Sequence, residues 1–127
     1  MTTEPESDFS LSIEERCNYL YAFYTGPKDT LAVSTKIVTQ ISQEAEKRGI
    51  SKVLMDEDFP NQVSTMEMYD ICETLVQLFG RCKKVAHVDR NPGDLDLNQF
   101  GETIAVNRGL EIRAFATVED AEKWLGE

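Results

Sequence analysis

The chain has 127 residues, and its 23 acidic and 13 basic side chains give it a formal net charge of −10. This length fits one domain that buries its own core, so folding requires neither a disulfide nor a structural metal. The negative charge repels nucleic acids and anionic membrane surfaces, and no apolar run approaches the length of a membrane span. The composition therefore argues against a nucleic-acid-binding protein and against stable membrane insertion.

The beginning of the chain and its cysteines indicate a cytoplasmic protein. Residues 1–8 are polar and acidic, unlike a signal or transit peptide, and they predict a disordered tail before a domain over residues 9–127. Cys17, Cys72 and Cys82 lack the spacing of metal ligands or of a redox pair. We expect reduced thiols, with Cys17 and Cys72 buried and inert.

Two strands are predicted at the start of the domain. Apolar and polar side chains alternate over residues 9–13, which indicates a strand with one solvated face. Residues 17–24 are apolar or aromatic on both faces, which is typical of a strand inside a sheet. Because only the polar residues 14–16 separate the two segments, we expect an antiparallel pair.

Four helices alternate with three further strands in the rest of the chain. The strands are expected at residues 52–56, 85–88 and 110–115. Each helical segment has an apolar stripe and follows a residue suited to cap its first turn. The expected N-caps are Asp29 or Thr30, Ser64 in a capping box with Glu67, Asp96 in a weaker box with Gln99, and Thr117; the expected C-terminal glycines are Gly49, Gly80 and Gly109.

The resulting element order is β-β-α-β-α-β-α-β-α. Strands that alternate with helices through short loops favour a parallel sheet whose crossovers are helical. The first strand adds an antiparallel edge to that sheet. The sequence therefore predicts an α/β domain with a mostly parallel sheet.

Residues 107–115 and 118–125 resemble the end of SpoIIAA-like (STAS-type) domains, where a G-x-x-[VI]-x-x-F strand leads into an x-E-x-A-x-x-W-L helix. Residues 52–56 before a loop and a helix, and residues 24–26 before the first helix, are similar as well. The likeness extends over nearly the whole chain from about Phe9. It implies a single-wound SpoIIAA-like fold, which STAS modules share with the larger CRAL-TRIO lipid carriers.

The resemblance also implies a non-enzymatic regulatory or protein-interaction module, often switched by phosphorylation where a central loop enters the next helix. Here that junction holds Ser64 and Thr65, without the Asp and Gly of the usual Asp-Ser-Ser-Gly pattern. A phosphate on either hydroxyl would be stabilised by the helix N-terminus, although Ser64 could simply cap the helix. The protein partner is unidentified, and a homodimer is left open. The expected partner-binding residues are Asp56, Asp58, Phe59, Asn61 and Met66.

Two alternative functions remain. A small carrier or sensor of an apolar, lipid-like ligand would use aromatic and methionine side chains as its pocket. The expected lining residues of that pocket are Tyr21, Phe23, Met68 and Phe79.

The other alternative is an acidic-site metal binder or enzyme. Asp56, Glu57 and Asp58 follow one central strand and Asp89 follows the next, so their carboxylates could hold Mg²⁺. We expect these acids instead to be solvated loop residues. His87, the only histidine, is expected to be a structural residue within the sheet. The sequence thus predicts no catalytic residue, no cofactor and no metal.

Overall fold

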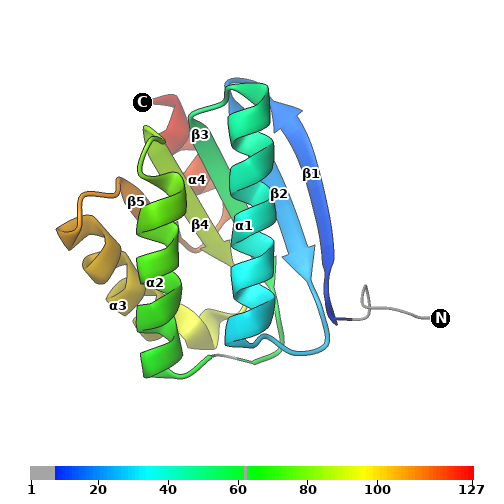
Figure 1. Cartoon of the computed structure of the whole chain (residues 1–127), viewed down its shortest axis with the longest axis vertical. Helices are drawn as coiled ribbons and strands as arrows, with labels where there is room; N and C mark the ends of the chain where they lie inside the picture. Colours follow the sequence, from blue (N-terminus) through cyan, green and yellow to red (C-terminus); the bar gives the residue numbers. More distant parts are fainter. Residues whose placement is uncertain (1–7, 62) are drawn as a thin grey trace.

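The computed structural model describes residues 8–61 and 63–127. Residues 1–7, which make up nearly all of the expected tail, lie outside the described residues. Strands and helices follow one another in the predicted order (Figure 1), with one added 3-10 turn. Their bounds are β1 (Ser10–Arg16), β2 (Tyr19–Thr25), α1 (Leu31–Arg48), β3 (Lys52–Asp58), α2 (Thr65–Phe79), β4 (Lys84–Asp89), η2 (Pro92–Asp94), α3 (Leu95–Asn107), β5 (Ile112–Phe115) and α4 (Val118–Gly126).

The strands form one five-stranded sheet in the order β1-β2-β3-β4-β5. β1 pairs with β2 in antiparallel orientation, and every other neighbouring pair is parallel. Spatial order equals chain order, so the sheet is wound in a single direction. The predicted α/β class, the mostly parallel sheet and the antiparallel first strand are therefore confirmed.

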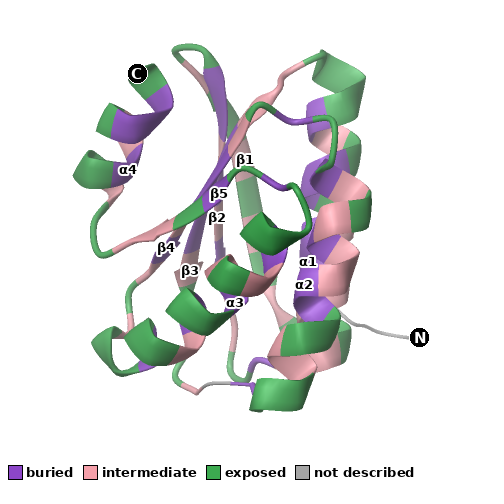
Figure 2. Ribbon diagram, turned by 90° about the vertical axis from the view of Figure 1, so that its left-hand side faces the viewer, coloured by how far each residue is buried: buried purple, intermediate pink, exposed green. Residues whose placement is uncertain are grey.

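The two faces of the sheet are covered unequally (Figure 2). α1, α2 and α3 lie on one face, and α4 lies on the other. Since side chains alternate along a strand, β3 contributes to both cores. Val53 and Met55 join the larger core beneath α1 and α2, while Leu54 joins the smaller core that Trp124 and Leu125 of α4 complete. Among the described residues, no helix has the length and apolarity that crossing a membrane requires.

Three helix starts agree with their sequence signals. The hydroxyls of Thr30, Ser64 and Thr117 each accept a hydrogen bond from a backbone N–H three residues later. α1 ends at Arg48 and is capped by Gly49, which has a φ of 68° that favours glycine. The predicted capping box at Asp96 is wrong. Because η2 runs directly into α3, the helix begins at Leu95 and Asp96 already lies in its first turn.

The strands differ from their predicted bounds in a way that matters for the site. β1 includes the polar residues 14–16, because an edge strand tolerates polar side chains while its backbone pairs with β2. The chain reverses instead at Cys17 and Asn18, where Asn18 has a φ of 69°. Cys17 is consequently exposed, whereas Cys72 is buried as expected. β3 and β4 continue through Asp58 and Asp89, so acids expected in loops belong to strands.

Candidate functional site

Four polar side chains gather where neighbouring parallel strands end. Tyr24 lies near the end of β2, Glu57 near that of β3, and His87 and Asp89 near that of β4. All four face the layer of α1, α2 and α3. Side chains an even number of residues apart on a strand share a face, and each of the four is separated in this way from a residue of the larger core, namely Ala22, Met55 or Val85. The β3–β4 register aligns Met55 with His87 and Glu57 with Asp89, which places the polar groups side by side.

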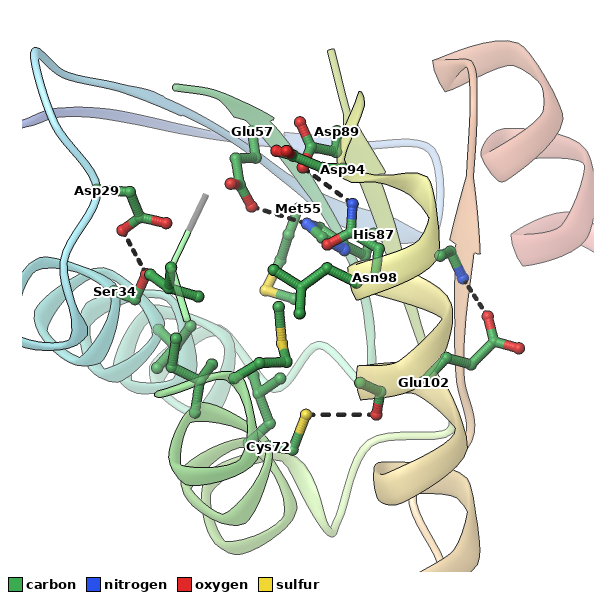
Figure 3. A pocket seen from close by; sticks show the side chains of 18 of the residues that line it. Asp29, Ser34, Met55, Glu57, Cys72, His87, Asp89, Asp94, Asn98 and Glu102 are labelled. Atoms are coloured by element: carbon green, nitrogen blue, oxygen red, sulfur yellow. Dashed lines mark hydrogen bonds and ion pairs between the residues drawn. The ribbon is translucent and has the colours of Figure 1, made fainter. Parts of the chain in front are cut away.

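A cavity opens over this cluster, between the sheet and the three helices (Figure 3). Its volume is about 70 Å³, roughly half that of an engineered protein cavity that admits benzene. It can therefore hold a few waters or a small polar ligand. The polar wall contains Asp29, Glu57, His87, Asp89, Asp94 and Asn98, and the apolar wall contains Ile37, Val38, Met55, Met68, Ile71 and Leu75.

His87 and Glu57 form the centre of the cluster. Nε2 of His87 lies 2.9 Å from Oε1 of Glu57, and the two side chains are 15% and 14% exposed. Burial lowers the pKa of His87, but the hydrogen bond to Glu57 and the nearby carboxylates of Glu57, Asp89 and Asp29 outweigh it and leave this pKa raised. His87 lies within the sheet, on β4, as expected, and its ring contacts a carboxylate and lines the cavity.

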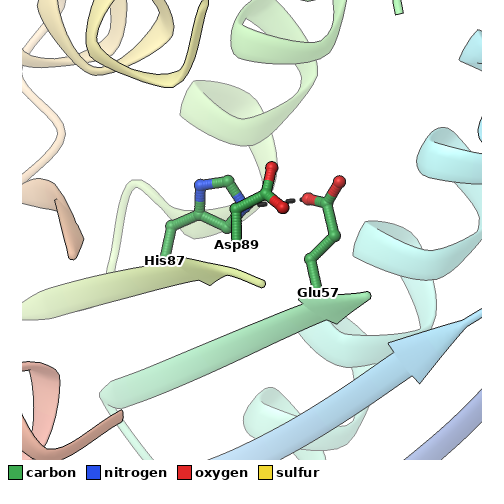
Figure 4. Close-up of side chains that lie close together, drawn as sticks. All are labelled: Glu57, His87 and Asp89. Atoms are coloured by element: carbon green, nitrogen blue, oxygen red, sulfur yellow. Dashed lines mark hydrogen bonds and ion pairs between the residues drawn. The ribbon is translucent and has the colours of Figure 1, made fainter. Parts of the chain in front are cut away.

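Asp89 is held in place from two sides. Its Oδ1 accepts a hydrogen bond from the backbone N–H of Asn91, and its Oδ2 accepts one from the Asn98 amide, each at 2.9 Å. Figure 4 shows its carboxylate beside the ring of His87 and the carboxylate of Glu57. One potential ligand atom from each of these three residues lies within 4.8 Å of the other two. The arrangement offers a cation three potential ligand atoms.

The cavity carries an excess of negative charge. Asp29 is buried in its wall and accepts a hydrogen bond of 2.6 Å from the Ser34 hydroxyl. Burial, with repulsion from Glu57 and Asp89, raises the pKa of Asp29 to about 6 despite that hydrogen bond. Within the described part of the chain, no lysine or arginine lines the cavity. The site therefore favours positively charged ligands over anions.

Comparisons with known proteins identify the fold. A scan against family models finds no match, and a search of the curated proteins finds no significant relative. An anti-sigma factor antagonist from Mycobacterium paratuberculosis superposes with a TM-score of 0.63 at 12% identity, over 98% of this chain and 100% of that one. An uncharacterized DUF3478-family protein with a SpoIIAA-like fold, from Shewanella loihica, superposes with a TM-score of 0.55 at 16% identity, over 98% and 99%.

The chain has a SpoIIAA-like fold. The predicted resemblance is thus confirmed at the level of the fold. In this SpoIIAA-like domain the cavity lies at the carboxyl ends of the parallel strands, where open α/β sheets commonly bind ligands.

The partner-binding residues expected from the sequence separate into exposed and buried ones. Asp58 and Met66 are exposed, as are Ser64 and Thr65. Phe59 is only 2% exposed and packs in the core near Tyr24, so its prediction as a partner contact is wrong. Asn61 is partly buried and bridges two loops: its side chain accepts from the backbone N–H of Asp29 and donates to the Asp29 carbonyl.

Asp56 belongs to neither the partner surface nor the cavity. It is fully buried on the α4 side of the sheet, where Arg90 donates to it from Nε at 3.0 Å and Nη2 at 2.8 Å. The Tyr21 hydroxyl also donates to this carboxylate. The guanidinium of Arg90 in turn lies over the Phe23 ring, 4.7 Å from its centre. Asp56 thus ties β2, β3 and the β4–η2 loop together, and its prediction as a solvated acid and partner contact is corrected.

The predicted apolar pocket is largely wrong as well. Of its four residues, only Met68 lines the cavity. Tyr21 and Phe23 lie on the opposite face of the sheet, engaged with Asp56 and Arg90, and Phe79 is fully buried in the core. Because side chains alternate along a strand, Tyr21 and Phe23 lie on the face of β2 opposite to Tyr24, which lines the cavity together with Met68.

The sequence brought Glu57 and Asp89 to neighbouring strand ends, but sequence reasoning missed that His87 lies beside them on the same face of the sheet. A signal was present: Met55 and Glu57, like His87 and Asp89, are two residues apart. Residues with this spacing share a face of a strand. The signal was lost because the predicted strands end at residues 56 and 88, which leaves both acids in loops.

Proposed function

We propose that this chain is a non-enzymatic, STAS-type regulatory module that acts in the cytoplasm by binding a protein partner. The fold supports the proposal, since a solved protein of the same fold is an anti-sigma factor antagonist, by name a regulator. The identity of 12% means that this support concerns the type of module and leaves the partner open.

The observation that carries the proposal is the exposure of Met66. This side chain lies in the first turn of α2 and is 80% exposed, so it has little packing role within the chain. Tyr69, three residues later on the same side of the helix, is 42% exposed. Methionine is an adaptable contact residue at protein-binding surfaces, and tyrosine combines an apolar ring with a polar tip. We call Ser64, Thr65, Met66 and Tyr69 the α2 surface.

The proposed switch is a phosphate at the start of the α2 surface. The Ser64 hydroxyl accepts from the backbone N–H of Glu67 at 3.1 Å, while the Glu67 carboxylate accepts from the backbone N–H of Ser64 at 2.9 Å. A phosphate on Ser64 would gain from the helix N-terminus but be repelled by Glu67. Thr65, exposed and one residue later, is the alternative acceptor. Either phosphate would place about two negative charges beside Met66.

The test is capture of a protein partner from a native lysate of the source organism by the immobilised chain, with mass spectrometric identification. We expect Met66→Asp to lower the retained partner at least tenfold, because a desolvated charge at the centre of an interface costs more than about 1.4 kcal/mol. The matched control is Val106→Asp on α3, where the wild-type side chain is also exposed, at 47%. Equal retention by both variants, or no partner retained by the wild type, would overturn the proposal.

The switch has its own pair of variants. Ser64→Asp adds a charge and Ser64→Asn adds none, yet both side chains cap a helix well, so both variants keep α2 intact. We expect the Asp variant to bind the captured partner more weakly than the Asn variant. Equal affinities would remove the switch and leave the binding module standing.

A further inference from the structure

We propose that Glu57, His87 and Asp89 form a binding site for one divalent transition-metal ion, of the Zn²⁺ or Mn²⁺ class, on the wall of the cavity. The site goes beyond the proposed protein-binding function, and it shares no residue with the α2 surface. It differs from an ordinary group of surface acids in two respects. It includes an imidazole, and it opens into a cavity.

The spacing of the donor atoms fits such an ion. Metal–nitrogen and metal–oxygen bonds to Zn²⁺ are about 2.0–2.1 Å long, so neighbouring ligands lie about 2.9 Å apart in an octahedral site and about 3.3 Å apart in the tetrahedral site that zinc commonly adopts. Nε2 of His87 and Oε1 of Glu57 are separated by 2.9 Å. The ion would take the place of the proton that lies between Nε2 of His87 and Oε1 of Glu57, and that proton would leave to solvent. The carboxylate of Asp89 supplies the third ligand, because one potential ligand atom from each of the three residues lies within 4.8 Å of the other two.

The charges around the site favour a cation. Asp29 adds a carboxylate to those of Glu57 and Asp89 on the cavity wall, and Figure 3 shows all three turned toward the same space. The guanidinium of Arg90 is engaged with Asp56 on the other face of the sheet and does not line this cavity. A divalent ion would offset the repulsion among the carboxylates of Asp29, Glu57 and Asp89.

The surroundings also hold the ligands in position and leave room for others. The Asn98 amide and the Asn91 backbone each donate to Asp89, and such outer contacts orient metal ligands in known sites. The 70 Å³ cavity beside the cluster can accommodate waters at the remaining coordination positions. A metal ion held by three protein ligands keeps coordination positions at which water or another small molecule can bind and exchange. A structural site, by contrast, has all its positions filled by the protein.

The donor set decides the class of ion. Imidazole suits zinc, iron, copper and nickel, whereas Mg²⁺ and Ca²⁺ prefer sites made of oxygen atoms alone. Two carboxylates extend the range towards Mn²⁺. The site is therefore expected to prefer Zn²⁺ or Mn²⁺ to Mg²⁺, unlike the all-acid magnesium site considered from the sequence.

The single histidine gives a direct test on the folded full-length chain. The ring nitrogens of His87 are observed by NMR during titration with Zn²⁺ and, separately, with Mg²⁺. All samples carry Cys17→Ser, because this exposed thiol could bind zinc by itself. We expect Zn²⁺ to shift the ring signals and to saturate them at one equivalent, with Mg²⁺ at the same concentration leaving them in place. Ring signals whose chemical shifts do not change on addition of Zn²⁺ would overturn the proposal.

A matched pair of variants tests the carboxylates. Glu57→Gln and Asp58→Asn each remove one negative charge from the end of β3, but only the first removes a proposed ligand. By calorimetry we expect the first to weaken Zn²⁺ binding about tenfold or more and the second to change it less than about twofold. Equal losses would show diffuse attraction to a negative surface and refute the site. Asp89→Asn provides a second ligand variant, and circular dichroism checks that each variant is folded.

Discussion

Three consecutive acids at the end of β3 have three different surroundings. The side chain of Asp56 points to the α4 face and is neutralised by Arg90. Glu57 points to the opposite face and meets His87, and Asp58 is exposed. The alternation of strand side chains alone separates the first two, which are neighbours in sequence. At the residue scale, charge therefore predicts a role only once the face of the strand is known.

Asp29 gives a prediction about pH. Its pKa of about 6 in the folded protein exceeds the ordinary aspartate value of about 3.9, because burial and the carboxylates of Glu57 and Asp89 disfavour its charge, against the opposing hydrogen bond from Ser34. The folded state thus holds this proton more tightly than the unfolded state. Stability from this group is complete below about pH 4 and is lost as the pH rises through about 6.

Asp29→Asn removes this titration while preserving an acceptor for Ser34. We expect the variant to gain on the order of 2 kcal/mol in unfolding free energy relative to the wild type between about pH 4 and 7. Urea unfolding of both proteins across this range measures the difference. If the two stability curves run parallel with pH, Asp29 is ionised in the folded protein throughout, and the prediction is wrong.

At the scale of elements, the turn between β2 and α1 depends on Gly26. A Cβ added there would lie 2.6 Å from the backbone oxygen of Asp8 and 3.0 Å from the Phe59 ring, so β1 and its approach could not keep their present positions. We expect Gly26→Ala to lower the unfolding free energy by about 1–3 kcal/mol. Gly126→Ala is the control, since a Cβ at Gly126 meets nothing within 4 Å. Urea denaturation compares the two, and similar stabilities would contradict the close approach.

Most elements were predictable because each carries a local signal. Hydroxyl caps at Thr30, Ser64 and Thr117 fix three helix starts, and apolar periodicity fixes the faces of the helices. Strand ends carry no such signal when their last residues are charged. The contact of His87 with the two acids was missed for that reason, since it depends on the final residues of β3 and β4 and on the register between them. Register is a long-range property that one strand alone does not reveal.

At the scale of the whole molecule, the two cores share the same strands. β3 sends Val53 and Met55 into the core beneath α1 and α2, and Leu54 into the core beneath α4. The ends of α4 and of two strands are also joined, because Lys52 and Lys84 donate through Nζ to the last carbonyls of α4, each at 2.6 Å. Neither core can be dismantled without exposing strands of the other, so we predict that the described domain unfolds as one cooperative unit.

Trp124, the only tryptophan, makes cooperative unfolding measurable because it lies in the smaller core. The centres of the Trp124 and Phe115 rings are 5.6 Å apart. Its fluorescence reports the docking of α4, while far-UV circular dichroism reports all helices, and we expect the two urea transitions to coincide. Lys84→Met removes the bond to α4 at a cost of about 1 kcal/mol and should lower both midpoints equally. If the midpoint of the fluorescence transition falls to a lower urea concentration while that of the circular dichroism transition does not, α4 detaches from a sheet that stays folded, and the prediction is wrong.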